Sequence, residues 1–565
     1  MKKILLILIS FYYLFIHLYA KTWIVSKDTN SDFSTITSAI SNSSTGDTIY
    51  IKSGIYNEMI YITKGGTKNS YFTIIGDSIN KPIIDATGLD GDYIIEINNQ
   101  NFIILKNLEI QGTPTGSDPT GVLVRGSCSN IIIENLKIHD IKNPKQGAHG
   151  IHVYANSGDS PSSNIIIKEN EIYDCQLGYS EAITLNGNVD GFLVENNIIH
   201  DIDNIGIDMA GFWGVAPYND QARNGVCRRN FLYNITSKDN PAYNGYISCA
   251  AIYVDGGRKI VIEQNIIKNG DFGISIGSEN KDKITDSVFV RNNLIYFCNK
   301  DGIIIGGSSD ENGWAKNCYF YNNTLFKNSI HPDVGWAQLT VQRAENNYIF
   351  NNIIYTSDKN IAFADYTNDS IEVNHFDYNL FYSDNPSNIR WEMGGIAMDF
   401  DNYRSITSFG EHSMLDDPLF IDTASYNFRL QESSPAIDKG DPDFFISDTI
   451  LDLDGNKRVN NIVDLGCYEF YSATYITNLN NNNLKTTINV FPNPFNPILN
   501  IEVYNKYKNA VIKVININGK IIKTFKLKFG YNKIKFSGKN LSSGIYFIAL
   551  DNKKDFILKK VVLVK

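Results

Sequence analysis

The feature that most constrains this chain is an asparagine that recurs at nearly even spacing through its middle. A short β-branched run precedes it and an apolar pair follows, as in IIIKENEI (165–172) and FLVENNII (192–199). The eight positions, separated by 27 to 35 residues, are Asn170, Asn197, Asn230, Asn265, Asn293, Asn323, Asn352 and Asn379. A repeat of this length built from strands predicts a solenoid rather than a compact core.

The asparagines explain how such coils could be held in register. Neighbouring coils of a solenoid lie about 4.8 Å apart, the spacing of paired strands. An inward asparagine at a turn can bond the backbone and stack on the amide of the next coil. Leu108 and Leu136 fall at the same point of two earlier coils. We therefore expect an all-β, single-stranded parallel β-helix.

The repeat resembles the right-handed parallel β-helix superfamily of pectate lyases and related glycan-active proteins. Residues 33–62 resemble the opening of such proteins, where a short helix caps the first coil. SPAIDKGDP (434–442), DLDGNKR (452–458) and VDLGCYEF (463–470) resemble a module that closes secreted β-helices. The resemblance implies a right-handed β-helix over residues 21–470, acting on a polysaccharide or oligosaccharide.

The two ends of the chain have other compositions. Residues 1–20 combine two lysines, an apolar stretch and a final alanine, which is typical of a secretory signal peptide. This stretch is short for a bilayer span, which needs about 20 apolar residues. Residues 471–487 are rich in asparagine and threonine, as expected of a flexible linker.

Residues 488–565 predict a small β-sandwich, because apolar and polar positions alternate between glycine turns. The motifs PNPFNP, NGK and LSSGIYF and the terminal lysines resemble the C-terminal sorting domain of type IX secretion. The resemblance implies the type IX secretion machinery as a partner and an extracellular or cell-surface location. A carbohydrate-binding module is less favoured, because this segment has no tryptophan.

Charge and cysteine content exclude some functions. The net charge is -10, and the tail carries fifteen lysines against three acids, so the preceding chain is near -22. Such an acidic body argues against nucleic acid as a partner. The seven cysteines have no CxxC spacing, and we assign no metal ligands from them. We expect a monomer.

Candidate site residues follow from aligning the strands after each ladder position. These strands read GIHVY (150–154), AITLN (182–186), GIDMA (206–210), AIYVD (251–255), GISIG (273–277) and GIIIG (302–306). Their second and fourth residues are apolar and should point inward, so the third and fifth should point outward. The third column contains His152, Thr184, Asp208 and Tyr253, and the fifth contains Asp255, with Glu279 one coil later.

The two longest coils carry Asp208 and Asp255. Their extra residues form loops 211–225 and 236–248, which are rich in aromatic residues that could wall a sugar site. We therefore predict Asp208, Asp255, Glu279 and His152 as catalytic residues. The predicted substrate-binding residues are Glu181, Tyr253, Trp213, Arg223 and Arg258.

Three functions fit this arrangement. Paired carboxylates suit a glycoside hydrolase, with one as acid and the other as nucleophile or base. The same acids could hold calcium in a polysaccharide lyase of the pectate type, with a basic side chain removing the C5 proton. A non-enzymatic adhesin or glycan-binding surface would need neither. We favour the hydrolase.

The sorting motif yields the first prediction. Deleting residues 488–565 should leave a folded β-helix in the periplasm of a type IX-competent host, because the export signal is gone. Fractionation and surface proteolysis would measure this. Normal surface delivery of the truncated chain would contradict the assignment.

Overall fold

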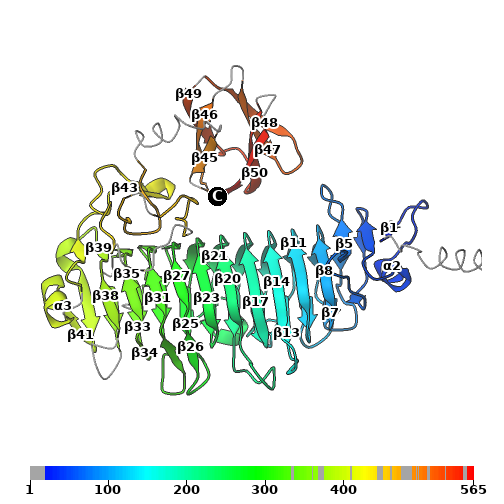
Figure 1. Ribbon diagram of the computed structural model, residues 1–565, viewed down its shortest axis with the longest axis horizontal. Helices are drawn as coiled ribbons and strands as arrows, with labels where there is room; N and C mark the ends of the chain where they lie inside the picture. The colour runs from blue at the N-terminus through cyan, green and yellow to red at the C-terminus, as the bar shows by residue number, and fades with distance from the viewer. Residues whose placement is uncertain are drawn as a thin grey trace, which may run out of the picture. The chain divides into compact units, whose positions relative to one another are not determined.

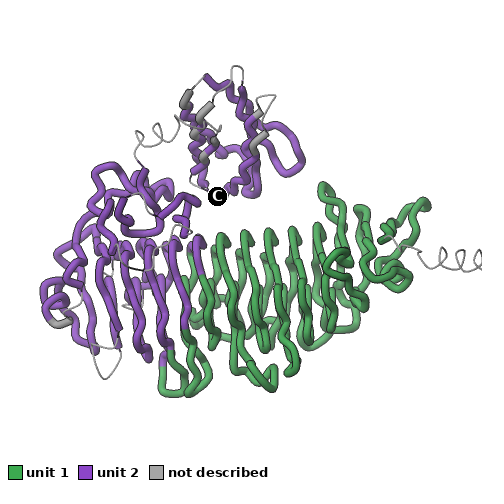
Figure 2. Tube along the Cα trace, viewed as in Figure 1, with its two compact units in different colours: residues 1–261, 269–286, 309–314 green, residues 262–268, 287–308, 315–565 purple. Residues whose placement is uncertain are grey.

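A computed structural model describes the chain over residues 20–332, 336–358, 361–366, 374–407, 410–441, 444, 450–458, 461–471, 487–491, 493, 495–505, 510–528, 530–551 and 556–564. Except for Ala20, the predicted signal peptide lies outside these residues, and so does the predicted linker between Tyr471 and Thr487. The chain divides into two compact units, one of residues 1–261, 269–286 and 309–314 and one of the remainder (Figure 2).

The first unit is a parallel β-solenoid, with strands stacked coil on coil (Figure 1). Each coil contributes one strand to each of three sheets. The β1 sheet contains β1 (Thr22–Val25), β2 (Thr48–Ile51), β5 (Phe72–Gly76), β8 (Asn101–Lys106), β11 (Ser129–Glu134), β14 (Ser162–Lys168), β17 (Val189–Glu195), β20 (Arg223–Arg228) and β23 (Arg258–Glu263). The β4 sheet contains β4 (Ile60–Ile62), β7 (Tyr93–Asn98), β10 (Thr120–Arg125), β13 (His149–Ala155), β16 (Ile183–Gly187), β19 (Ile207–Ala210), β22 (Ala250–Asp255) and β25 (Phe272–Gly277). The third sheet contains β3 (Ile55–Tyr56), β6 (Ile83–Asp85), β9 (Glu109–Gln111), β12 (Lys137–His139), β15 (Glu171–Cys175), β18 (Ile198–Ile202) and β21 (Phe231–Ile235).

The second unit also contains stacked parallel strands, which are followed by a helix and an antiparallel strand pair. One parallel stack contains β27 (Phe289–Arg291), β31 (Tyr319–Tyr321), β35 (Tyr348–Phe350) and β38 (His375–Asp377). A second contains β29 (Ile303–Ile305), β33 (Leu339–Val341), β37 (Ile361–Asp365) and β40 (Arg390–Met393). A third contains β24 (Ile266–Gly270), β28 (Leu294–Tyr296), β32 (Thr324–Phe326), β36 (Ile353–Tyr355), β39 (Leu380–Tyr382) and β42 (Met414–Leu415). Helix α3 (Phe400–Thr407) and the antiparallel pair β43 (Phe420–Asp422) and β44 (Asn427–Leu430) follow.

The predicted asparagine ladder is confirmed within each unit. Asn197 Oδ1 accepts hydrogen bonds from the backbone N and the Nδ2 of Asn170, both at 3.0 Å. Its own Nδ2 donates to the carbonyl of Ile167 and to Asn230 Oδ1, again at 3.0 Å. In the second unit, the same bonds join Asn265, Asn293, Asn323, Asn352 and Asn379 in turn. Each buried amide therefore satisfies backbone groups of two coils.

The inward and outward columns of the β4 sheet are also confirmed. The predicted inward residues, such as Ile151, Leu185 and Val254, are fully buried. Strand pairing places the third-column residues directly opposite one another from coil to coil: His152, Thr184, Asp208, Tyr253 and Ser275. A one-residue slip would exchange the two faces, so the buried apolar columns fix the register.

Helix α2 (Ile36–Asn42) caps the first coil, as the opening motif implies. Thr35 is its N-cap and accepts a hydrogen bond from the backbone of Ser38. The helix buries Ile36, Ala39 and Ile40. It therefore covers apolar residues that the first coil would otherwise expose.

The C-terminal segment forms two small antiparallel sheets, as predicted. One contains β45 (Thr487–Phe491), β46 (Ile498–Asn505) and β49 (Gly530–Ser537), and the other β48 (Ile521–Lys526), β47 (Val511–Asn516), β50 (Gly544–Asp551) and β51 (Phe556–Leu563). Residues of both sheets, including Leu499, Ile501, Ile512 and Ile548, share one buried core. This packing is that of a β-sandwich.

All seven cysteines lie among the described residues, are buried and form no disulfide. Among the described residues, no helix is long and apolar enough to cross a membrane.

The ladder generates a stability prediction. Asn197→Leu should lower the free energy of unfolding, because it leaves the amide of Asn170 and the carbonyl of Ile167 buried without partners, at about 1 to 3 kcal/mol for each group. Asn80→Leu, at an exposed position, should have little effect. Thermal melting of both variants tests this, and equal shifts would contradict a structural ladder.

Candidate active site

The acids predicted from the strand columns lie on the β4 sheet of the first unit. Asp208 is the third-column residue of β19, and Asp255 ends β22 at the fifth-column position. Strand pairing places Asp255 opposite Ala210 and Gly277. Glu279 follows β25 by two residues. The solenoid thus brings acids from three successive coils onto one face.

Asp255 is held by two donors. Its Oδ1 accepts a hydrogen bond from the backbone N of Glu279 at 2.6 Å, and its Oδ2 accepts one from Trp213 Nε1 at 2.7 Å. The side chain is almost completely buried. Burial, together with the nearby charge of Glu279, raises its pKa to about 7, although both hydrogen bonds act in the opposite direction. The carboxyl can therefore hold a proton near neutral pH.

Asp208 is also buried in this group. It is only 6% exposed, and its Oδ1 has no hydrogen-bond partner among the described residues. Burial is the main cause that raises its pKa, and the charges of Glu181, Asp255 and Glu279 add to it. Glu279 is exposed by comparison, and partial desolvation by the surrounding protein raises its pKa. The group therefore contains acids of unequal exposure.

Glu181 joins these acids to two histidines. Thr184 Oγ1 donates to Glu181 Oε2 at 2.7 Å, and His149 Nδ1 lies 3.0 Å from the same hydroxyl oxygen. Burial raises the pKa of Glu181 to about 7, with contributions from Glu279 and Asp255. His149 and His152 are both buried, with ring centroids 4.0 Å apart.

The two predicted loops border this group. Trp213, in loop 211–225, is 51% exposed while its indole N–H binds Asp255. Tyr243, in loop 236–248, packs on Tyr179 with ring centroids 5.8 Å apart. Burial raises the pKa of Tyr243, and the charges of Glu279 and Glu181 raise it further, so the second loop also lies near the acids.

Two predicted residues are not brought to this face. Arg223 begins β20 and Arg258 begins β23, both in the β1 sheet. Arg223 is buried, 3.2 Å from Asp190 and 2.8 Å from Asn188 Oδ1. Its guanidinium therefore stabilises the turns beside it. Tyr253, in contrast, is half-buried in the third column opposite Asp208.

The structure adds residues that the sequence analysis missed. Asp118 and Arg125 belong to the coil before His149 and His152, and Leu123 of β10 pairs with His152. Arg125 stacks on Tyr93, with its guanidinium carbon 4.7 Å from the ring centroid. Extending the column alignment back to GVLVR (121–125) would have found this coil, because it has the same inward pattern.

The face is covered rather than open. Asp208, Asp255, His149 and His152 are each less than 10% exposed. Hollows of about 360 and 150 Å³ lie in the second unit, beside Arg404 and Asp384, and contain none of the predicted site residues. Acid chemistry, rather than cavity size, therefore identifies the candidate site.

Comparison with known proteins supports the architecture. Residues 24–200 match a family described as "Pel9A-like, right handed beta helix region", and residues 250–407 match "Right handed beta helix region". Residues 489–565 match "Secretion system C-terminal sorting domain". The resemblance to both families is confirmed. The sorting domain directs the protein through type IX secretion to the extracellular space or the cell surface.

Several solved structures are similar over most of this chain. The A-module of the Azotobacter vinelandii mannuronan C-5 epimerase AlgE6 is 12% identical, with 67% of this chain and 92% of that chain covered and a TM-score of 0.44. The GH136 lacto-N-biosidase of Eubacterium ramulus is 12% identical, with 70% and 67% covered and a TM-score of 0.43.

A curated protein is more similar in sequence. The "Uncharacterized protein YwoF" of Bacillus subtilis (strain 168) is 33% identical over 416 residues, which are 72% of this chain and 88% of that protein. The chain therefore belongs to the family of YwoF, as a right-handed parallel β-helix with a C-terminal secretion sorting domain.

Proposed function

We propose that this protein is a secreted glycan-cleaving enzyme, a glycoside hydrolase that uses Asp255 as general acid and Glu279 as the opposing carboxylate. The observation that carries the proposal is the pKa of about 7 that burial and the Glu279 charge give Asp255. Pairs of carboxylates with unequal environments are what glycoside hydrolysis requires.

The two acids have environments suited to different roles. Asp255 is nearly buried, so below pH 7 it carries a proton for the leaving oxygen. Glu279 is exposed and can meet a sugar or an attacking water in its charged form. Burial and the charges of Glu181, Asp255 and Glu279 raise the pKa of Asp208, so this side chain keeps its proton and we assign it no role in proton transfer.

Aromatic side chains beside the acids suit a sugar ring. Trp213 is half-exposed and fixed by its bond to Asp255, and Tyr253 is half-buried one coil from Asp208. A ring stacked on Trp213 would place its glycosidic oxygen near the acid that the indole N–H holds. The long loop thus contributes both binding and orientation.

A calcium-dependent polysaccharide lyase is the second candidate. It is favoured by the accumulation of Glu181, Asp208, Asp255 and Glu279, since carboxylate oxygens are the ligands that calcium prefers. The neutral imidazoles of His149 and His152 would then be candidates for the base. A non-enzymatic glycan-binding surface is the third candidate, and it predicts no turnover at all.

The acid role of Asp255 gives a direct test on a substrate found by screening polysaccharides. Asp255→Asn should lower kcat/KM by about 100-fold or more, because the amide cannot donate the proton. The wild-type rate should fall above pH 7, as Asp255 loses its proton, and at acidic pH, as Glu279 gains one. Reducing-sugar release should occur without unsaturated product.

Two variants sharpen this test. Trp213→Phe removes the N–H that lowers the pKa of Asp255, so the basic limb of the pH profile should move to higher pH. Asp159→Asn, at an exposed position, should retain wild-type activity and profile. Near wild-type turnover by Asp255→Asn would overturn the assignment. Unsaturated product that needs added calcium would favour the lyase.

Asp208 allows a separate test of the buried charge. Its pKa is raised above the unfolded value of 3.8, so the unfolded chain ionises first and folding stability falls as the pH rises above about 4. Asp208→Asn should therefore raise the melting temperature at pH 8 but not near pH 4. The free energy of unfolding at pH 8 should rise by about 1.4 kcal/mol for each pKa unit relieved. Asp159→Asn is the control, and a pH-independent effect of Asp208→Asn would contradict the buried charge.

A further inference from the structure

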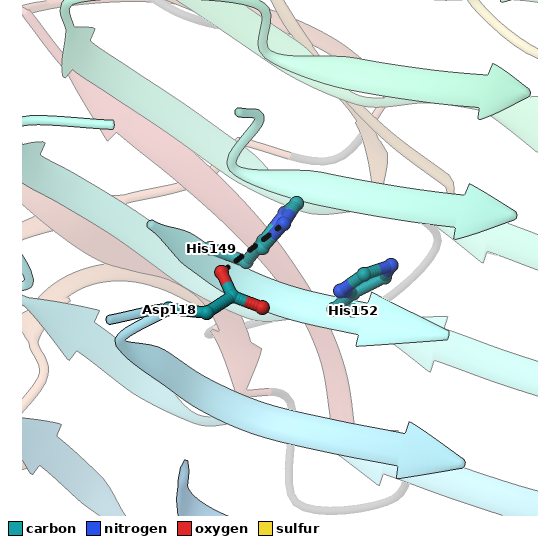
Figure 3. A group of neighbouring side chains, drawn as sticks. All are labelled: Asp118, His149 and His152. Carbon is teal, nitrogen blue, oxygen red and sulfur yellow. Dashed lines mark ion pairs between the residues drawn. The ribbon is translucent and has the colours of Figure 1, made fainter. Parts of the chain in front are cut away.

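Asp118, His149 and His152 form a compact group on the β4 sheet (Figure 3). Each offers one ligand atom, and these atoms all lie within 4.8 Å of one another. Asp118 Oδ1 and His149 Nε2 are 3.9 Å apart. Asp118 precedes β10, and both histidines belong to β13, where His149 is the first residue and His152 lies mid-strand.

Hydrogen bonding fixes the tautomer of His149. When Glu181 is ionised, Thr184 donates its only hydroxyl hydrogen to Glu181 Oε2, so the Thr184 oxygen accepts from His149 Nδ1. The proton therefore resides on Nδ1, and the lone pair on Nε2 faces Asp118. A metal-bound histidine usually donates its other ring N–H to a polar group, as His149 Nδ1 does here.

His152 supplies an independent observation. It is only 7% exposed, yet neither ring nitrogen has a hydrogen-bond partner among the described residues. A buried imidazole without a partner loses its hydrogen bonds to water and gains nothing in return. Its ring lies against that of His149, with one nitrogen directed into the group.

We propose that Asp118, His149 and His152 bind one first-row transition dication of the Zn²⁺ class. Bonds of about 2.0 to 2.2 Å place ligand atoms at most about 4.4 Å apart, so small side-chain rotations close the site. Two imidazoles and one carboxylate select such an ion over Ca²⁺ or Mg²⁺, which prefer oxygen ligands. Asp118 is 45% exposed, which leaves a path for the ion.

The surrounding charges favour a cation on balance. Glu181 lies 3.5 Å from His149, and Asp92 is close enough to raise the pKa of Asp118. Arg125 opposes the ion, but its guanidinium is directed to the face of Tyr93 and lies 3.8 Å from Glu96. The acidic side chains therefore outnumber the single base.

This inference does not depend on the proposed function. The ion would bind whether or not Asp255 and Glu279 turn over a glycan, and binding is measured without substrate. Failure of one test leaves the other intact.

The experiment is isothermal titration of Zn²⁺ into the full secreted chain after chelator treatment. We expect one ion per chain, and a rise in melting temperature on adding Zn²⁺. His152→Ala and Asp118→Asn should each weaken binding at least tenfold and abolish the melting shift. Asp118→Asn guards against misfolding, because that side chain is 45% exposed and, among the described residues, forms an ion pair with His149 alone.

His412→Ala is the matched control, since His412 also contacts a carboxylate, Asp377, at 2.7 Å but is exposed and lies outside the group. It should bind Zn²⁺ as the wild type does. Substituting Co²⁺ should give a visible spectrum without the intense near-ultraviolet band of thiolate ligation, which excludes the cysteines. Wild-type affinity in both His152→Ala and Asp118→Asn, or Ca²⁺ binding as tight as Zn²⁺ binding, would overturn the proposal.

Discussion

The hydrogen bonding of buried backbone between coils is the constraint on which this fold depends. Every turn that brings the chain inward exposes amides and carbonyls to an apolar interior, where an unpaired group is costly. The Asn197 side chain satisfies two such groups. It accepts a hydrogen bond from the backbone N–H of Asn170 and donates one to the carbonyl of Ile167. Because the same amide also bonds the asparagine of the next coil, each coil is fixed in register on its neighbour.

Register in turn creates the candidate site. With Val153, Leu185 and Met209 buried in one column, Asp208 has to occupy the opposite face. The long loops border that face, so Asp208 and Asp255 point outward but are buried, whereas Glu279 stays exposed. This costs stability, since burial and mutual repulsion raise their pKa values. A cluster of acids whose pKa values are raised at the expense of stability is a candidate functional site.

The repeating and local features could be predicted from the sequence. The asparagine spacing predicted the solenoid, the alternation in AIYVD (251–255) predicted which side chains point outward, and the PNPFNP tail predicted the sorting domain. A second short ladder, in which Asn374 bonds Asn347, was not predicted, because its few members form no long periodic series. Arg223 and Arg258 were predicted as substrate-binding residues, but the solenoid puts them in another sheet from the acids.

By itself, the sequence determined the solenoid architecture and which strand residues point inward or outward. Strand periodicity and the buried asparagine are local properties that recur in each coil. Only the tertiary structure decided which groups meet across coils. The hydrogen bond between Trp213 and Asp255 joins residues 42 positions apart. The hydrogen bonds that connect His149, Thr184 and Glu181 span two coils. Loop conformation and side-chain rotamers make these contacts, and no periodic pattern encodes them. The pKa values of the acids and the grouping of Asp118 with two histidines follow from burial and distance, which exist only once the coils are stacked.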